Sequence, residues 1–244
     1  MNYFICATPR SGSTWFCSLL KSTGIAGKLE SYFRAQDLGR WAAEWGLEAG
    51  AAGDIDFIDY VTAAQAASRT PNGVSCSRIM WGTLDEMLTA LRPHYPDHDG
   101  TDAELMQRAF GPTRYIRLIR QDLVSQAVSR FRAELSDVWH VEGQGEAGAE
   151  LDADSYDHAT IHRFVEEAEA HNRDWQIWLD ANQITPHVVT YEGLLDSPSD
   201  EIANVLVWLG LDPQAAQGVS SPNRRMADAV SADWVRRYNQ DAAR

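Results

Sequence analysis

Near the start of the chain, the stretch TPRSGST (Thr8–Thr14) lies between a short apolar run and a segment with helical periodicity. Backbone N–H groups at the start of a helix attract anions, and the helix dipole favours negative charge there. Glycine lets a phosphate approach the backbone closely, hydroxyls add donors, and an arginine adds a charged, two-pronged donor. The stretch is therefore typical of a phosphate-binding loop, and the residues that we expect around the phosphate are Arg10, Ser11, Gly12, Ser13 and Thr14.

This loop does not follow the Walker A pattern GxxxxGK[ST], in which a lysine reaches the terminal phosphates and a hydroxyl binds magnesium. Here the arginine precedes the glycine, and no Gly-Lys pair follows in the loop. Taken alone, the spacing is equally typical of an ordinary helix N-cap formed by Ser11 or Ser13. No acidic pair calls for a magnesium ion, so we expect no metal.

A second stretch, RLIRQDLVSQAVSR (Arg117–Arg130), joins the end of a predicted strand near Arg120 to a helix that begins two or three residues later. Ser125 and Ser129 are four residues apart and therefore share a face of that helix. Arg120 and Ser129 could together hold a second phosphate. By themselves, the serines favour a solvated helix face.

Short apolar segments alternate with helical patterns along the chain, which is typical of an α/β fold with a central parallel sheet flanked by helices. The predicted strands are Tyr3–Ala7, Val74–Met80, Arg114–Ile119 and His187–Tyr191. The predicted helices are Thr14–Lys21, Gln36–Glu48, Asp54–Arg69, Leu84–Arg92, Ala103–Phe110, Leu123–Leu135, Tyr156–Ala181, Glu201–Leu209 and Asp233–Ala242.

The length and composition favour one globular domain over residues 1–244, because 44% of the residues are hydrophobic. One run, VEGQGEAGAELDAD (Val141–Asp154), is rich in glycine and acidic residues. We interpret it as a mobile surface loop inside the domain. A lid over an active site is the functional alternative, because long loops often serve that way.

The net charge of −14, from 21 basic and 35 acidic residues, repels nucleic-acid backbones and anionic membranes. We therefore expect no nucleic-acid partner, whereas a few arginines can still make a positive pocket for a small anion. The three cysteines, Cys6, Cys17 and Cys76, form no CxxC pair and are typical of core thiols in a reducing compartment. No signal peptide or membrane-spanning run is apparent, so we expect a cytoplasmic protein.

Considered together, TPRSGSTW, RTPNGV…RIMW (Arg69–Trp81) and RQDLVSQAVS (Arg120–Ser129) resemble the bacterial carbohydrate sulfotransferases typified by trehalose 2-sulfotransferase. The segment RRMADAVSADWVRRY (Arg224–Tyr238) resembles the closing segment of that family, so the resemblance covers nearly the whole chain. It implies a P-loop-like α/β fold that binds 3′-phosphoadenosine 5′-phosphosulfate (PAPS), the activated sulfate donor, and needs no metal.

The resemblance also assigns donor-binding roles. Residues 10–14 correspond to the 5′-phosphosulfate loop, and Arg120 and Ser129 correspond to the 3′-phosphate site. Tyr191, in VVTYEGLL, matches a position near the adenine, and Arg225 in the closing segment would approach the nucleotide phosphates.

On the acceptor side, the resemblance places a general base at Glu30 in GKLESYF. A carboxylate there would accept the proton that the acceptor hydroxyl loses. The segment lacks the proline of the family pattern, and a shift of one residue would put Ser31 at that position. Arg78 could contact a transferring sulfonate oxygen, although a surface arginine at a strand edge is an equal alternative.

Aromatic residues near these positions are candidates for the acceptor pocket, because aromatic rings stack on sugar faces; at helical spacing, however, they are more often core residues. The candidates are Tyr32, Phe33 and Trp81.

The sequence thus predicts a sulfotransferase that moves a sulfuryl group from PAPS to a hydroxyl of a carbohydrate or glycolipid acceptor. A P-loop small-molecule kinase is one alternative, which the missing GK[ST] element disfavours. A non-catalytic nucleotide- or sugar-binding module is another. A homodimer is compatible with the resemblance, because some relatives pair.

Overall fold

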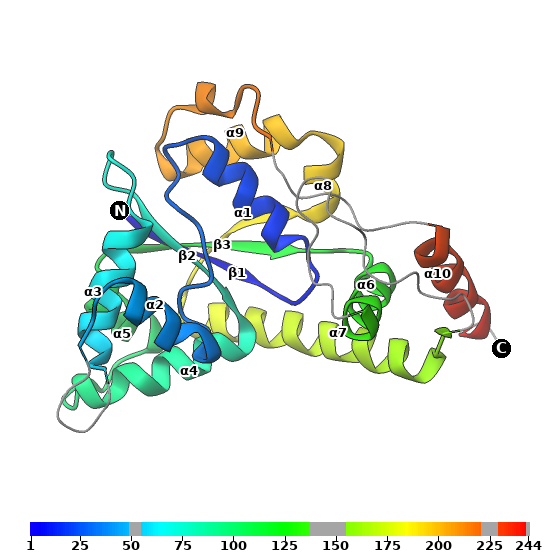
Figure 1. The fold of residues 1–244 in the computed structure, drawn as a ribbon, viewed down its shortest axis with the longest axis horizontal. Coiled ribbons are helices and arrows are strands. Elements are labelled where there is room, and N and C mark those ends of the chain that lie inside the picture. The colour runs from blue at the N-terminus through cyan, green and yellow to red at the C-terminus, as the bar shows by residue number, and fades with distance from the viewer. Residues whose placement is uncertain (49–54, 137–154, 221–228, 243–244) are drawn as a thin grey trace.

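The architecture was analysed in a computed structural model, which describes residues 1–48, 55–136, 155–220 and 229–242. Four parallel strands form one sheet in the order β2-β1-β3-β4. They are β1 (Asn2–Ala7), β2 (Ser75–Met80), β3 (Thr113–Ile119) and β4 (His187–Thr190). Helices flank the sheet on both faces, which confirms the predicted fold class (Figure 1).

The helices are α1 (Ser13–Ser22), α2 (Leu38–Glu44), α3 (Phe57–Ser68), α4 (Trp81–Leu91), α5 (Asp102–Phe110), α6 (Leu123–Ser136), α7 (His158–Ala181), α8 (Tyr191–Asp196), α9 (Pro198–Leu209) and α10 (Ala229–Asp241). Each predicted helix is present, with ends shifted by a few residues. The prediction was wrong at Tyr191, which begins α8 instead of ending β4. Thr190 causes the change, because its hydroxyl accepts from the Gly193 N–H, 3.0 Å away, and caps a new helix.

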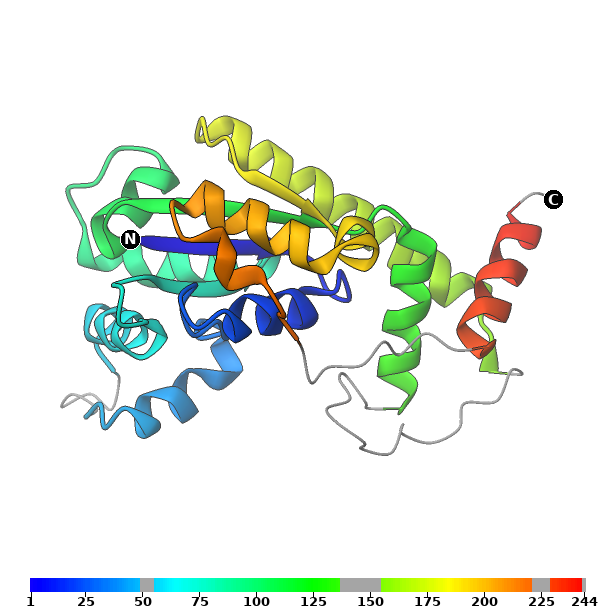
Figure 2. The ribbon, with the colours of Figure 1, turned by 90° about the horizontal axis from the view of Figure 1, so that it is seen from above.

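The central strand β1 is buried on both faces, and its alternate residues feed two separate cores. Tyr3 and Ile5 pack in a core with residues of α1 and α9. Phe4 and Cys6 point the other way, into a core built with α3, α4, α5 and α7. Figure 1 shows these layers, with α1 and α9 above the strands and α4 and α7 below them; in Figure 2, seen from above, α9 crosses in front of the sheet.

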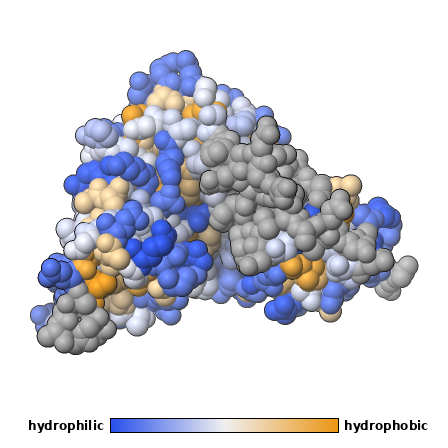
Figure 3. Space-filling model, viewed as in Figure 1, coloured by the Kyte–Doolittle hydropathy of each residue, from blue (hydrophilic) through white to orange (hydrophobic). Residues whose placement is uncertain are grey.

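A third apolar cluster joins α6, α10 and the first half of α7, beyond the carboxyl ends of the strands. Trp234 of α10 is fully buried there, with its ring centroid 5.4 Å from that of Phe131. No helix in the described parts of the chain combines the length and apolar character needed to cross a bilayer. On the face in Figure 3, hydrophilic residues predominate and hydrophobic residues occur in small groups.

Trp175 connects α7 to the carboxyl end of β1. Its indole Nε1 donates to the Ala7 carbonyl over 3.0 Å, and its ring packs edge-on against Trp81 at a centroid distance of 5.2 Å. The side chain is fully buried. It therefore helps to fix the start of the loop that follows β1.

We expect Trp175→Ala to lower the free energy of unfolding by about 3–5 kcal/mol, because it leaves a large cavity in the core. Ile177→Ala on the same helix is the matched control, since Ile177 is 58% exposed and should change stability by less than about 0.5 kcal/mol. Urea denaturation followed by circular dichroism measures both. Equal midpoints for the two variants would contradict this role of Trp175.

Candidate active site

The loop between β1 and α1 turns sharply at Arg10 and Gly12, whose φ angles are 61° and 87°. Positive φ is uncommon for a residue other than glycine, so the backbone at Arg10 is held there by its surroundings. The Ser11 hydroxyl and N–H both donate to the Thr8 carbonyl, over 2.8 and 3.3 Å. The loop therefore closes on itself before α1 begins at Ser13.

Side chains from other elements bind the backbone carbonyls of this loop. The Gln126 amide of α6, which is buried, donates to the Pro9 carbonyl over 2.7 Å and to the Thr8 hydroxyl over 2.9 Å. Arg120, just after β3, donates to the Arg10 carbonyl over 3.2 Å. These loop carbonyls already accept hydrogen bonds from side chains of the protein. An anion beside the loop would therefore interact with the N–H groups in the first turn of α1.

Two arginines meet beside the loop. Arg10 Nε donates to the Ser129 hydroxyl of α6 over 3.0 Å, and Arg120 lies 4.6 Å over the ring of Tyr191. Burial, and then the neighbouring charge of Arg120, lower the pKa of Arg10 to about 10. Arg10 thus stays protonated at neutral pH, while an anion placed beside the pair would reduce their repulsion.

The two predicted phosphate sites are adjacent. Ser129 and Arg120, which we predict to hold the second phosphate together, contact the Arg10 side chain and the Arg10 carbonyl respectively, so that shared phosphate site stays a prediction. The backbone N–H groups in the turn after β3 are already occupied by a side-chain carboxylate. Those of Gln121 and Asp122 donate to the Glu192 carboxylate over 3.1–3.2 Å. A second phosphate would therefore be bound there by side chains.

Tyr191 closes the same corner from α8. A Cβ built on Gly12 would overlap the Tyr191 ring, with Cε2 only 2.8 Å away, so only glycine fits at position 12. The ring also meets Trp15 of α1 edge-on, at a centroid distance of 6.0 Å. Tyr191 thus lies against both the loop and Arg120, and its role beside an adenine stays a prediction.

Arg78, near the end of β2, connects the loop to the segment that carries the predicted base. Its guanidinium donates to the Thr14 hydroxyl over 2.8 Å, to the Ser13 hydroxyl over 3.3 Å and to the Ser31 hydroxyl over 2.9 Å. Its backbone N–H donates to the Glu30 carbonyl over 3.0 Å. Arg78 is therefore an internal bridge of the site, and the alternative of an isolated surface arginine does not describe it.

Glu30 lies at the edge of this cluster with 43% of its side chain exposed, and its carboxylate forms an ion pair with Lys21 of α1. A shift of one residue would put Ser31 at the position of the general base. The Ser31 hydroxyl accepts a hydrogen bond from Arg78. Glu30 is thus partly exposed and paired with Lys21, whereas the Ser31 side chain is part of the bridge; the identity of the general base stays a prediction.

Tyr32 and Phe33 do not face a pocket. They are 4% and 3% exposed and lie in the core on the α3–α5 side of the sheet. Tyr32 donates to the Lys28 carbonyl over 2.7 Å, and Phe33 packs edge-on against Phe110 at 5.4 Å. Both rings are covered by protein, so we do not include Tyr32 and Phe33 in the proposed acceptor site. Trp81 is half-buried at the start of α4.

Two other predictions fall outside the described residues: Arg225 and the loop at 141–154. Within the described residues, no three His, Cys, Asp or Glu side chains are arranged to hold a metal ion.

The sequence reasoning missed Gln126 and Arg117. Arg117 is 3% exposed inside β3, and its guanidinium donates to the Cys6 carbonyl over 3.0 Å and to Asn172 of α7. A signal was present for each: Gln126 is a polar residue on the buried face of a helix, and Arg117 is a charge within an apolar strand. Buried polar groups need partners, and here the partners are backbone carbonyls near the loop.

We expect Gly12→Ala to lower the free energy of unfolding by about 1–3 kcal/mol, because it combines a positive φ with an overlap on the Tyr191 ring. In a Tyr191→Ala background the same change should cost less, since the overlapping ring is gone. Urea denaturation of the two single variants and the double variant measures this coupling. Additive costs would show that the Gly12–Tyr191 contact is unimportant.

The chain is similar to curated proteins along its length. It is 28% identical to trehalose 2-sulfotransferase of Mycolicibacterium smegmatis and 27% identical to that of Mycobacterium tuberculosis, covering 99% of this chain and 96% of each relative.

Two solved structures are also similar. A sulfotransferase from Alicyclobacillus acidocaldarius aligns with a TM-score of 0.47 and 12% identity, over 99% of this chain and 92% of that one. The sulfotransferase domain of the Synechococcus PCC 7002 olefin synthase aligns with a TM-score of 0.44 and 16% identity, over 100% of this chain and 95% of that one.

A family model described as Stf0 sulphotransferase matches residues 2–241, a range that runs from β1 through α10 and contains every residue of the site described above. By this match over nearly its whole length, the chain belongs to the Stf0 sulfotransferase family.

Proposed function

We propose that this sulfotransferase-family protein uses PAPS as its donor and transfers the sulfuryl group to a hydroxyl of a carbohydrate or glycolipid. The observation that carries the proposal is the convergence of Arg10, Arg78 and Arg120 around one loop in a chain of net charge −14. Two relatives that span the chain are named for a trehalose sulfotransferase activity, which supports a carbohydrate acceptor.

For the donor, the 5′-phosphosulfate would bind at Ser11, Gly12, Ser13 and Thr14, where the first N–H groups of α1 meet these hydroxyls. The 3′-phosphate would bind beside Arg120 and Ser129, and the adenine beside Tyr191. Arg225 would add a further contact to the phosphates. The residues present fit this group, because they provide both guanidinium charges and neutral donors within one cluster.

The transfer would proceed in line. The acceptor oxygen forms a bond to sulfur, the bond between sulfur and the bridging phosphate oxygen breaks, and adenosine 3′,5′-bisphosphate leaves. Arg10 and the start of α1 would stabilise the charge that grows on the leaving phosphate, and Arg78 would stabilise the sulfonate oxygens. The proton of the acceptor hydroxyl would pass to the Glu30 carboxylate.

On the acceptor side, Arg78 and Trp81 remain our candidates, since both lie at the carboxyl end of β2, where Arg78 is hydrogen-bonded to the Glu30 carbonyl. We also propose a cytoplasmic location. All three cysteines are free and buried, which suits a reducing compartment.

We expect calorimetric titration to show tight binding of adenosine 3′,5′-bisphosphate, much weaker binding of ADP, and no effect of magnesium. Arg10→Ala and Arg120→Ala should each weaken the bisphosphate about 10- to 100-fold, since each removes a charge-assisted hydrogen bond. Arg173→Ala is the control, because the Arg173 side chain on α7 is 67% exposed. A magnesium-dependent preference for ATP would instead favour a kinase and overturn the proposal.

We expect Glu30→Gln to lower kcat about 10²- to 10⁴-fold with PAPS and trehalose, because the amide cannot accept the acceptor proton. The affinity for adenosine 3′,5′-bisphosphate should stay unchanged, which separates catalysis from donor binding. Glu44→Gln, on an exposed residue of α2, serves as the control. Wild-type turnover in Glu30→Gln would place the base at another residue.

A further inference from the structure

A cavity of about 730 Å³ lies at the amino end of β3, lined by residues from β3, α5, α9 and the segment after α7. It forms because β4 begins at His187, opposite Ile116, and so does not extend beside Thr113–Tyr115. The volume is within the range of small-molecule sites, which is about 300–1,000 Å³.

This cavity is separate from the candidate active site. The phosphate-binding loop and Arg120 lie at the carboxyl ends of the strands, whereas Thr113 and Tyr115 lie at the other end of β3. At about 3.3 Å per residue, the seven-residue strand puts the two places about 20 Å apart. A ligand in the cavity would therefore not touch the residues proposed for sulfuryl transfer.

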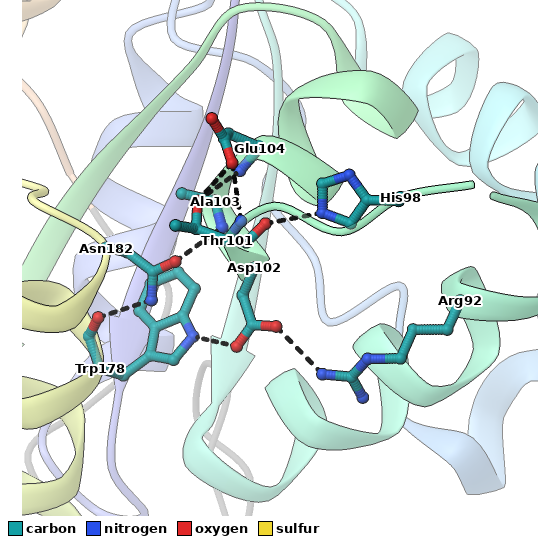
Figure 4. Close-up of polar contacts among 8 residues, drawn as sticks. All are labelled: Arg92, His98, Thr101, Asp102, Ala103, Glu104, Trp178 and Asn182. Atoms are coloured by element: carbon teal, nitrogen blue, oxygen red, sulfur yellow. Dashed lines mark hydrogen bonds and ion pairs between the residues drawn. The ribbon is translucent and has the colours of Figure 1, made fainter. Parts of the chain in front are cut away.

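A polar network fixes the wall where α5 meets the end of α7 (Figure 4). The Asn182 side chain accepts from the Ala103 N–H over 2.8 Å and donates to the Trp178 carbonyl over 2.8 Å. Asp102 accepts from the Trp178 indole and from Arg92, each over 3.0 Å. These bonds tie the two helices together, so the wall is pre-organised for a ligand.

The lining offers neutral hydrogen-bonding groups. Gln107, Gln183 and Thr185 are exposed along it. The two charged lining residues are already engaged. Glu104 accepts from the Thr101 N–H over 2.7 Å in a capping box, and Arg114 donates to the Trp208 carbonyl and lies 5.4 Å over the Trp208 ring. Amides and hydroxyls beside an aromatic wall suit hydroxyl groups better than ions.

Tyr115 forms part of the inner wall. It is 5% exposed, its ring packs against Phe4 and Trp178, and its hydroxyl has no hydrogen-bond partner among the described residues. Burial raises the pKa of this hydroxyl well above its usual value, so it stays protonated. This hydroxyl is enclosed by protein and not open to the cavity, so Tyr115 forms part of the wall but offers a ligand no hydrogen bond.

We propose that this cavity binds a small neutral molecule rich in hydroxyl groups, of the size of a mono- or disaccharide, at a site distinct from that of sulfuryl transfer. Neutral donors and acceptors would pair with the ligand hydroxyls beside the Trp208 ring, which also packs against Arg114 and His187. The site stands independently of the proposed function, because none of its residues takes part in that chemistry.

Proton–nitrogen correlation spectra of the ¹⁵N-labelled full chain test this site, with trehalose as the probe. Trp208→Phe identifies the indole signal of Trp208 among the nine tryptophans of the chain. We expect that signal to shift saturably as trehalose is added. Gln107→Ala should weaken the titration about fivefold, the effect of losing one neutral hydrogen bond.

Gln176→Ala is the matched control for Gln107→Ala, because Gln176 is exposed on α7 and pairs with Asp180 away from the cavity. It should leave the titration unchanged. No saturable shift at Trp208 up to the solubility limit of trehalose, or equal affinities in Gln107→Ala and Gln176→Ala, would overturn the proposal. Neither readout depends on sulfotransferase activity.

Discussion

The conformation of the loop between β1 and α1 depends on hydrogen bonds that its backbone accepts from distant side chains. Gln126 from α6, Trp175 from α7 and Arg120 after β3 each donate to a carbonyl between Ala7 and Arg10. Three elements that are far apart in the sequence must therefore pack correctly before the loop has its shape. In this sense the anion site is a product of the whole α/β fold, although its residues are nearly contiguous.

Charge distribution explains how an acidic protein can present such a site. Arg10 is mostly buried and close to Arg120, and both effects lower its pKa to about 10. Holding two guanidinium groups together costs free energy in the absence of an anion. That cost is recovered best by a ligand with more than one negative charge, whereas singly charged anions recover less of it. The net charge of −14 would further repel large polyanions.

The order of strands and helices could be predicted from the sequence because the apolar runs and the helical periodicity are strong. The strand, turn and helix around residues 8–14 could be predicted for the same local reason, whereas the phosphate-binding role of that turn stays a prediction. Gln126 and Arg117 could not, because their roles depend on which carbonyls the fold brings to them. Tyr32 and Phe33 were misleading, since the sequence does not distinguish a ring that faces a sugar from one that faces Phe110 or Lys28. The single domain over residues 1–244 stays a prediction.

Helix α7 touches every region discussed above. Its first half packs with α10, where His162 and the Tyr238 hydroxyl are 2.7 Å apart. Trp175 contacts the end of β1, and Asn182, just after the helix, borders the second cavity. Its 24 residues make a rod of about 36 Å, so a tilt of one degree about its midpoint would move each end by about 0.3 Å. The helix thus connects the α10 cluster, the end of β1 and the start of α5 as one continuous element.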